Sequence, residues 1–393
     1  MSKNVPNVRF EGFVDKWRKA SIDEIMSIRK ETGNQNDYSL DVELENLVSD
    51  MGVLIGDLSI RTQSNSIFRK GDILFGRLRP YLNKWWLSNT EGVKSGEIWA
   101  FYPQGENSNV FLYSLIQTYK FLSVANTSSG TKMPRSDWSN LSNVVVYLPQ
   151  FEEQQKIGSF FKQLDDTIVL QRKLVEQQQQ YKKAMLQKMF PQKGERVPKV
   201  RFDGFSEDWT ELKMGEVFEQ TNEYINPKES NLELFSLTVE KGLTQKTARY
   251  NREFLVKKAD KFKKVGPNEF VYNPMNMTLG AVGFNGSNFS VAVSGYYVTM
   301  KIKMECNNEY FRIVLTSSQA IRLYKLYATG SLIEKQRVQF PTFSEISIKV
   351  PVLEEQQKIG AFFKQLDDTI ALHQKKLEDY QQLKKALLQR IFV

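Results

Sequence analysis

Two stretches of the chain place apolar residues on one face of a helix. In residues 152–190 the positions Ile157, Phe161 and Leu164 follow steps of four and three residues, and residues 354–392 repeat this pattern. Each stretch lies just after a proline and begins with an acidic pair, which suits the first turn of a helix. The pattern predicts two helices of nearly 40 residues, each about 60 Å long at about 1.5 Å per residue. One apolar stripe on so long a helix needs a partner, so we expect an antiparallel coiled coil within the chain.

The segments outside these helices show the shorter patterns of mixed helix and strand structure. Apolar runs bounded by turn residues predict strands, and two longer stretches with helical spacing predict helices. The predicted strands are Ile73–Phe75, Glu97–Tyr102, Glu269–Tyr272 and Tyr296–Ile302, and the predicted helices are Val110–Leu122 and Glu309–Leu326. The expected fold class is therefore α+β, with mixed α/β domains and two long helices.

The chain is also an internal repeat. Residues 149–190 align without gaps on residues 351–392, with 28 identities in 42 positions. A second motif, Val-Pro-x-Val-Arg-Phe-x-Gly-Phe, occurs at residues 5–13 and again at 197–205. The segments between the repeated blocks resemble each other only faintly. Similar scaffolds that carry dissimilar domains indicate one task performed on two different targets.

The repeat predicts six parts and a pseudo-two-fold arrangement. The parts are a motif at 1–17, a variable domain at 18–148, a helix region at 149–196, a motif at 197–209, a second variable domain at 210–350 and a helix region at 351–393. If the long helices pack antiparallel, each motif should lie beside the end of one of them. The motif at 8–10 is expected near Phe392, and the motif at 200–202 near Phe190.

Composition excludes several classes of protein. Hydrophobic residues make up 41% and charged residues 25% of the chain, which excludes wholesale disorder. A single cysteine, Cys306, and a single histidine, His373, exclude an intrachain disulfide and zinc sites built on several such residues. No stretch is apolar enough to span a membrane, and residues 1–6 hold no signal core, so we expect a soluble cytoplasmic protein. The net charge of +9 suits a polyanionic partner.

The repeated blocks resemble the specificity subunits of type I restriction–modification enzymes. The resemblance rests on the Glu-Glu-Gln-Gln-Lys-Ile-Gly helices that start at Glu152 and Glu354, on the Val-Arg-Phe-x-Gly-Phe motif and on the two-fold plan. It covers the whole chain. The variable domains match in outline only, through residues 70–74 and 78–82.

The resemblance implies a DNA-binding subunit with no catalysis of its own. Each variable domain would be a target recognition domain that reads one half of an asymmetric, bipartite site in double-stranded DNA. The two helices would separate these domains and set the spacing between the half-sites. The subunit would dock two methyltransferase subunits, which recruit ATP-driven nuclease and translocase subunits. S-adenosylmethionine, ATP and Mg²⁺ would then belong to partner subunits, and no cofactor or metal is expected in this chain.

Several loops combine cations, amides and aromatic residues and are candidates for DNA contact. Arginine can pair bidentately with guanine, asparagine with adenine, and lysine mostly holds phosphate. The candidates are Arg77, Arg79, Asn83, Lys84, Lys132 and Arg135 in the first domain, and Arg249, Arg252, Asn273, Asn276, Lys335 and Arg337 in the second. A basic run at 246–264 suits phosphate contact. The alternative for each residue is an ordinary surface charge or a packed side chain.

The helix blocks carry three further features. Each helix carries an acidic pair, Asp165-Asp166 or Asp367-Asp368. The two side chains of a pair point about 100° apart around the helix axis, so they cannot act together as acid and base on one substrate. We interpret these four residues as a solvated or methyltransferase-facing surface. His373 falls on the helix seam, where a packed and hydrogen-bonded histidine is expected. Gly158 and Gly360 lie within the helices, which indicates close approach of another backbone.

Two other functions are alternatives. A stand-alone DNA methyltransferase or nuclease would need nucleotide or methyl-donor loops. No Gly-x-x-x-x-Gly-Lys-Ser/Thr loop is present, and residues 273–276 lack the second proline and the aromatic residue of an adenine methyltransferase loop. A coiled-coil adaptor with no role on nucleic acid would not explain two complete domains that diverge on a repeated scaffold.

Overall fold

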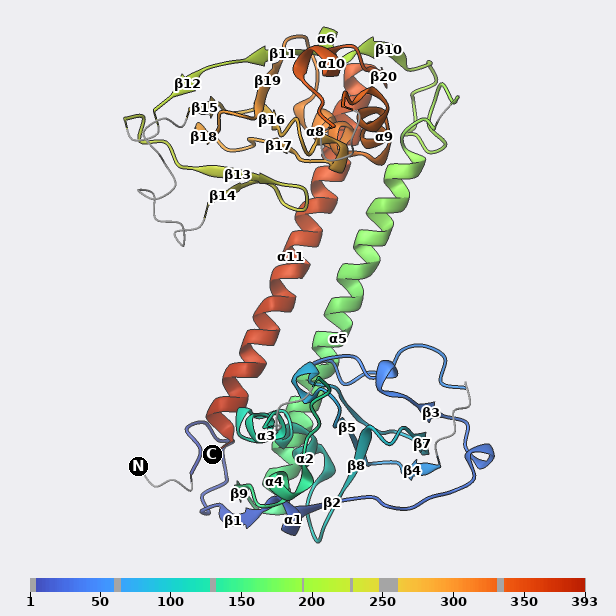
Figure 1. Cartoon of the computed structure of the whole chain (residues 1–393), viewed down its shortest axis with the longest axis vertical. Coiled ribbons are helices and arrows are strands. Elements are labelled where there is room, and N and C mark those ends of the chain that lie inside the picture. The colour runs from blue at the N-terminus through green and yellow to red at the C-terminus, as the bar shows by residue number, and fades with distance from the viewer. Residues whose placement is uncertain are drawn as a thin grey trace. The chain divides into compact units, whose positions relative to one another are not determined.

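The computed structural model describes residues 5–59, 65–127, 132–192, 194–226, 229–246, 261–330 and 336–392. The chain forms two compact units, shown with their elements in Figure 1. The first unit comprises the chain up to Glu176 together with the segment from Leu372 onward, and the second unit comprises Gln177–Ala371. Mixed helix and strand structure is present in both, as the sequence predicted.

The two long helices are α5 (Phe151–Lys188) and α11 (Leu353–Ile391). In the first unit the start of α5 packs against the end of α11 through Leu164, Ile168 and Leu377. There the Gln171 side-chain amide nitrogen lies 2.9 Å from His373 Nδ1 and donates to the His373 carbonyl oxygen at 2.9 Å. The predicted antiparallel pairing and the hydrogen-bonded seam histidine are confirmed within this unit, and Gln171 and His373 are equivalent positions of the repeat.

The same pairing occurs within the second unit, between the end of α5 and the start of α11. Lys182 forms an ion pair with Asp367 at 2.5 Å, and the Tyr181 and Phe362 rings meet edge to face at 6.4 Å between centroids. Later residues of α5 therefore face earlier residues of α11, whereas in the first unit earlier residues of α5 face later residues of α11, as antiparallel pairing requires. The pseudo-two-fold relation of the repeat is thus kept in the contacts of each unit.

The first unit encloses the larger of its cores between a sheet and several short helices. Strand β1 (Arg18–Ser21) pairs antiparallel with β9 (Val145–Leu148), so the segment between them begins and ends at one place. In the described residues an antiparallel sheet has the order β2-β8-β5-β6, and a smaller one has the order β3-β7-β4, in which β3 and β7 are parallel. The remaining elements are α1 (Ile22–Ile25), β2 (Met26–Ile28), η1 (Gln35–Asp37), β3 (Asp41–Val42), η2 (Leu44–Asn46), β4 (Ser66–Phe68), β5 (Ile73–Gly76), η3 (Pro80–Leu82), β6 (Trp85–Leu87), β7 (Gly92–Lys94), β8 (Ile98–Pro103), α2 (Asn109–Leu115), α3 (Tyr119–Ala125) and α4 (Trp138–Ser142).

The second unit repeats this plan with different sequences. Strand β10 (Thr210–Lys213) pairs antiparallel with β20 (Ser347–Val350), and an antiparallel sheet has the order β11-β19-β16-β17. Within the described residues the strands β12-β15-β18 form a further sheet and β13-β14 a hairpin. The remaining elements are α6 (Met214–Val217), β11 (Phe218–Thr221), β12 (Tyr224–Ile225), β13 (Phe235–Thr238), β14 (Gly242–Gln245), β15 (Phe262–Val265), β16 (Phe270–Tyr272), η4 (Met277–Leu279), β17 (Val282–Phe284), β18 (Val291–Ser294), β19 (Val298–Ile302), α8 (Asn308–Thr316), α9 (Ser318–Tyr327) and α10 (Phe340–Ser344).

The structure corrects the two predicted domain helices. The expected helix at Val110–Leu122 is broken into α2 and α3, and the one at Glu309–Leu326 into α8 and α9. The breaks have a local cause, because the side chains of Thr118 and Ser317 each accept a hydrogen bond from the backbone amide three residues ahead and so begin new helices. Hydrophobic spacing alone does not register such an internal cap.

Residues conserved between the two helix copies dock each domain on its long helix. The Gln154 side chain accepts a hydrogen bond from Ser108 N at 3.0 Å, and Gln356 accepts one from Asn307 N at 3.0 Å. One turn later, a Cβ added to Gly158 would meet the backbone of residues 110–111. A Cβ added to Gly360 would likewise meet the segment 307–310. The predicted close backbone approach at both glycines is confirmed.

Gly158→Ala is therefore expected to destabilise the first unit by about 2 kcal/mol. The new methyl group would press on the backbone at the start of α2, and overpacking costs about 1–3 kcal/mol, more than the gain in helix propensity of about 1 kcal/mol. Chemical denaturation of the purified chain measures the change. The matched control is Ser159→Ala at the neighbouring exposed position, where the other copy has Ala361. Equal stability of both variants would contradict the close approach.

The Val-Arg-Phe motifs bind both long helices. Arg9 pairs bidentately with Glu153 at 2.7 Å for both bonds, and the amides of residues 7 and 8 donate to the Arg390 carbonyl oxygen at 3.0 and 3.2 Å. In the second unit Arg201 pairs with Glu355 at 2.7 and 2.8 Å. The first motif also packs in the same apolar cluster as Phe392, and Phe202 packs in that of Phe190. The predicted positions of the motifs are confirmed.

A buried lysine lies in the smaller sheet of the first unit. Lys94 is 4% exposed and its ammonium donates to the Ile98 carbonyl oxygen at 2.8 Å. Burial lowers the pKa of this ammonium to about 8, from an ordinary value of 10.5. The folded state therefore binds the proton less tightly than the unfolded state. The cost of burying the charged ammonium opposes folding in full below about pH 8, and this cost decreases as the pH rises toward 10.5.

Lys94→Met is expected to raise the free energy of unfolding at pH 7 by about 1–3 kcal/mol. The upper limit is the cost of the lowered pKa, and the lost hydrogen bond to Ile98 reduces it. The advantage of the variant should shrink between pH 8 and pH 10. Denaturation of both proteins at several pH values tests this, with the exposed Lys30→Met as control. A constant difference across that range would contradict the assignment.

Candidate nucleic-acid interface

The candidate residues of the first domain come together on one surface. After β5 the chain passes through residues 77–84, which include η3, before it enters β6. Residues 132–136 lie directly beside this connection, because Arg79 N donates to Pro134 O at 2.7 Å and Ser136 N donates to Arg77 O at 2.8 Å. We call residues 77–84 and 132–136 the first loop pair. Two stretches that are about 50 residues apart in sequence thus form a single candidate site.

The three arginines of the first loop pair differ in what holds them. Arg135 makes hydrogen bonds to both carboxylate oxygens of Glu97, and this guanidinium holds the pKa of Glu97 below its ordinary value. The Arg77 guanidinium lies 5.2 Å from the centre of the Trp99 ring. Arg79 is exposed and has a left-handed backbone with φ of 50°. Lys132 is exposed as well.

Two predicted DNA contacts in this loop are directed toward their own unit. The Asn83 amide donates to Asp50 Oδ1 at 2.9 Å, and the Lys84 ammonium donates to the Leu44 carbonyl oxygen at 2.7 Å. Both side chains are half-buried. Their polar groups stabilise the fold around the loop, and their assignment to DNA contact stays a prediction.

The second unit has an equivalent loop pair. Residues 273–281, which include η4, connect β16 to β17, and they lie beside residues 336–338 because Val338 N donates to Pro274 O at 3.0 Å. We call 273–281 and 336–338 the second loop pair. Asn276 and Arg337 are exposed on it, whereas Asn273 is half-buried and its side-chain oxygen accepts a hydrogen bond from Met275 N at 3.1 Å.

The basic run at 246–264 is described only in part. Two candidates of this run, Arg249 and Arg252, lie outside the described residues, and so does the candidate Lys335 further along the chain. Lys263 is 4% exposed, its ammonium donates to the Tyr297 carbonyl oxygen at 2.9 Å, and burial lowers its pKa. Lys264 pairs with Glu223 at 3.0 Å. Lys263 is therefore a buried side chain of the β12-β15-β18 sheet and corrects the expectation of a phosphate contact.

The acidic pairs of the helices divide in the same way in both copies. Asp165 is 6% exposed and forms an ion pair with Lys384 at 2.5 Å, while burial raises its pKa. Asp367 bridges Lys182 and Arg312 at 2.5 and 3.0 Å. These two residues stabilise contacts within their own units, and Asp165 is buried rather than solvated. The assignment of both to a methyltransferase-facing surface stays a prediction. Asp166 and Asp368 are exposed, and their assignment to a partner surface stays a prediction.

Exposed apolar side chains surround both loop pairs and were not among the predicted site residues. Tyr81 and Met133 are 57% and 46% exposed on the first pair. Met275 and Leu279 are 51% and 59% exposed on the second, and Tyr296 beside it is 90% exposed. Such residues can contact thymine methyl groups or stack on bases. Their position next to the cationic and amide residues is the signal that would have identified them.

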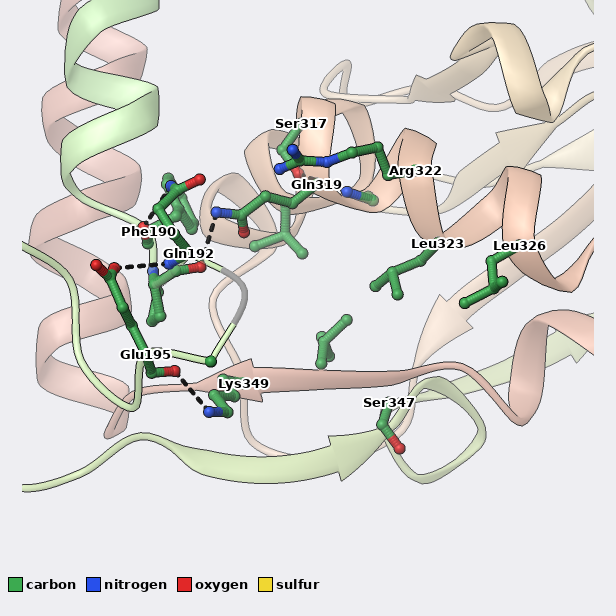
Figure 2. Close-up of a pocket in the computed structure, with 15 residues that line it drawn as sticks. Phe190, Gln192, Glu195, Ser317, Gln319, Arg322, Leu323, Leu326, Ser347 and Lys349 are labelled. Carbon is green, nitrogen blue, oxygen red and sulfur yellow. Dashed lines mark hydrogen bonds between the residues drawn. The ribbon is translucent and has the colours of Figure 1, made fainter.

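A cavity of the second unit lies apart from the loop pairs. It measures about 510 Å³ and lies among the segment after α5, helix α9 and strand β20, as Figure 2 shows. Its wall is held by hydrogen bonds from Gln319 to Pro191 O at 2.7 Å and from Lys349 to Glu195 O at 2.6 Å. None of the candidate DNA-contacting residues lines it.

Metal-ligating clusters and membrane spans were also sought. In the described ranges no three or more histidine, cysteine, aspartate and glutamate side chains gather as metal ligands would. None of the helices in those ranges has the length and apolarity needed to cross a membrane.

Comparison with known proteins identifies relatives of the chain. The specificity subunit of the type I restriction enzyme EcoDI of Escherichia coli is 23% identical over 168 residues, which cover 41% of this chain and 38% of that subunit. The specificity subunit of MjaVIII of Methanocaldococcus jannaschii is 24% identical over 290 residues, which cover 70% of this chain and 67% of that subunit. The matches thus span between about two fifths and two thirds of these relatives.

Two solved structures share the fold. The S subunit of the type I restriction–modification system from M. genitalium has a TM-score of 0.68 at 14% identity, over 99% of both chains. A chain from a study of complex assembly and conformational transition of the type I R-M system has a TM-score of 0.51 at 17% identity, over 96% of this chain and 98% of that chain. The model of the family described as type I restriction modification DNA specificity domain matches this chain at residues 15–178 and again at 206–381. Both repeats match over most of their length, and the chain therefore belongs to the family of type I restriction–modification specificity subunits.

Proposed function

We propose that this chain directs a type I restriction–modification complex to an asymmetric, bipartite site in double-stranded DNA. Each domain reads one half-site, and the long helices set the unread spacer between the half-sites. One observation carries the proposal: the first and second loop pairs occupy equivalent places in two similarly built units but present different side chains there. A repeated scaffold with different reading loops is what two different half-sites require.

The chain itself performs no catalysis in this proposal. It docks two methyltransferase subunits, through which nuclease and translocase subunits join the complex. S-adenosylmethionine, ATP and Mg²⁺ belong to those partners. The relative whose study concerns type I complex assembly supports partnership with other subunits. A gel-shift of duplex DNA with the chain alone, and with a cognate methyltransferase subunit, distinguishes this function from an adaptor that does not touch DNA.

Exchange of residues 18–148 for the first domain of another family member is expected to change one half-site completely and leave the other intact. Strands β1 and β9 begin and end this segment side by side, so a foreign domain can enter without a change in the helices. Mapping of methylated sites across the genome, with cells that carry the unmodified chain as control, measures the outcome. Changes in both half-sites would show that the domains do not read independently.

A further inference from the structure

Backbone hydrogen bonds align the two loop pairs residue by residue. The bonds that establish the alignment are Gly76 N to Lys84 O with Asn273 N to Ala281 O, and Ser136 N to Arg77 O with Val338 N to Pro274 O. In this alignment Arg79 corresponds to Asn276, and Arg135 corresponds to Arg337. Both Arg79 and Asn276 stand directly before a short 3₁₀ turn, η3 or η4. The same place of the fold thus holds a guanidinium in one domain and a carboxamide in the other.

The side chains at this place are available to a ligand. Arg79 and Asn276 are exposed, and in the described part of the chain neither side chain makes a hydrogen bond or ion pair. Arg135, by contrast, is held by Glu97. The left-handed backbone of Arg79 is unusual for a residue other than glycine, and such strain gathers at functional sites.

We infer that the position shared by Arg79 and Asn276 reads one base in each half-site. The inference rests on the proposed function. Arg79 donates two parallel hydrogen bonds to O6 and N7 of a guanine, and Asn276 pairs with N6 and N7 of an adenine. Charge attraction to phosphate does not explain the position, because Asn276 carries no charge. The exposed cations Lys132 and Arg337 lie on the adjacent segments and hold the phosphates.

The electrostatics of the two loop pairs support the same division of roles. In the first pair Glu97 neutralises Arg135, which leaves Arg79 and Lys132 as exposed cations of the described residues. Strand register extends the alignment, because Phe75 pairs with Trp99 and the equivalent Tyr272 pairs with Val298. Glu97 therefore corresponds to Tyr296, which is 90% exposed, and Arg337 has no carboxylate partner in the described ranges. Arg337 therefore supplies the charge there, and Asn276 is free to discriminate between bases.

The test is selection of duplexes from a random pool by the full chain in complex with its methyltransferase subunits. Arg79→Lys keeps the charge but removes the bidentate fork. At one position of one half-site, this variant should lower the preference for guanine over the other bases by about 5- to 150-fold, which is the range that a bidentate pair supplies. The base preferences of the other half-site should not change. Asn276→Arg should convert one adenine of the other half-site to guanine. Lys132→Gln is the matched control and should weaken binding to all sequences alike and lower its salt dependence.

The two arms separate the possible failures. If the unmodified complex selects a split site and both variants keep every base preference, the reading position is wrong while the proposed function stands. If the unmodified complex enriches no sequence, the proposed function fails and the inference with it. Circular dichroism and thermal unfolding verify that each variant is folded, and because the variants lie in different units, misfolding of one leaves the other decisive.

Discussion

Glu153→Gln is expected to lower the free energy of unfolding of the first unit by about 3 kcal/mol. The Glu153 side chain is 1% exposed and accepts both hydrogen bonds of the Arg9 guanidinium. Removal of one partner of a buried pair leaves the other charge without compensation, at a cost of about 3–5 kcal/mol. The lower end of this range applies, because Arg9 is 13% exposed and regains some contact with water.

The helix itself supplies the control for this prediction. Glu152→Gln removes the same charge from the same first turn at an exposed position, so it should cost only a few tenths of a kcal/mol. Denaturant unfolding of the two variants gives the comparison, and Arg9→Gln combined with Glu153→Gln should be less damaging than the sum of the single changes. Losses of equal size in Glu152→Gln and Glu153→Gln would show that the effect belongs to the helix dipole.

Insertion of seven residues into both long helices is expected to abolish modification of the original target and create a new one with a longer spacer. Gln171 and His373 are equivalent positions that face each other, so insertion after each of them lengthens both helices at one level. Seven residues add about 10 Å and keep the apolar seam in phase. At about 3.4 Å per base pair the unread gap should grow by roughly one to three base pairs. The half-site sequences should stay the same.

Smaller insertions test whether the seam or the length matters. A matched insertion of four residues, about one turn, should lengthen the gap less, whereas one residue added to α5 alone rotates the seam by about 100° and should destabilise the pairing. Genome-wide mapping of methylation reads the gap directly. An active seven-residue variant with an unaltered gap would show that the helices do not set the spacing, and an altered half-site would show that they do more than separate the domains.

The long helices and the repeat could be read from the sequence because their signals are periodic and local. The three- and four-residue steps of Ile157, Phe161 and Leu164 predict one buried face, and all three side chains are buried. Gly158 and Gly360 indicated close approach because glycine is unfavourable within a helix. The breaks at Thr118 and Ser317 could not be read, since the spacing on either side continues as one helix.

The candidate site was predictable in its composition but not in its arrangement. The loops around Arg79 and Asn276 stood out as mixtures of cations, amides and apolar residues. Whether a polar side chain faces solvent depends on neighbours distant in sequence, as with Lys84 on Leu44 O and Asp165 on Lys384. The equivalence of Arg79 and Asn276 was also hidden, because it follows from backbone hydrogen bonds in two domains whose sequences scarcely align.

The discontinuity of the first unit has a consequence for the order of events during synthesis. The second unit is one continuous stretch, Gln177–Ala371, so every partner it needs has been translated once Ala371 has left the ribosome. The first unit needs Lys384 against Asp165 and the Arg390 carbonyl oxygen against its N-terminal motif, and both follow that stretch in the chain. The domain that is translated first is therefore completed last. Until then, the apolar residues on the first-unit part of α5 lack the end of α11 that packs against them. Interrupted translation would release a finished second unit joined to an unfinished first one.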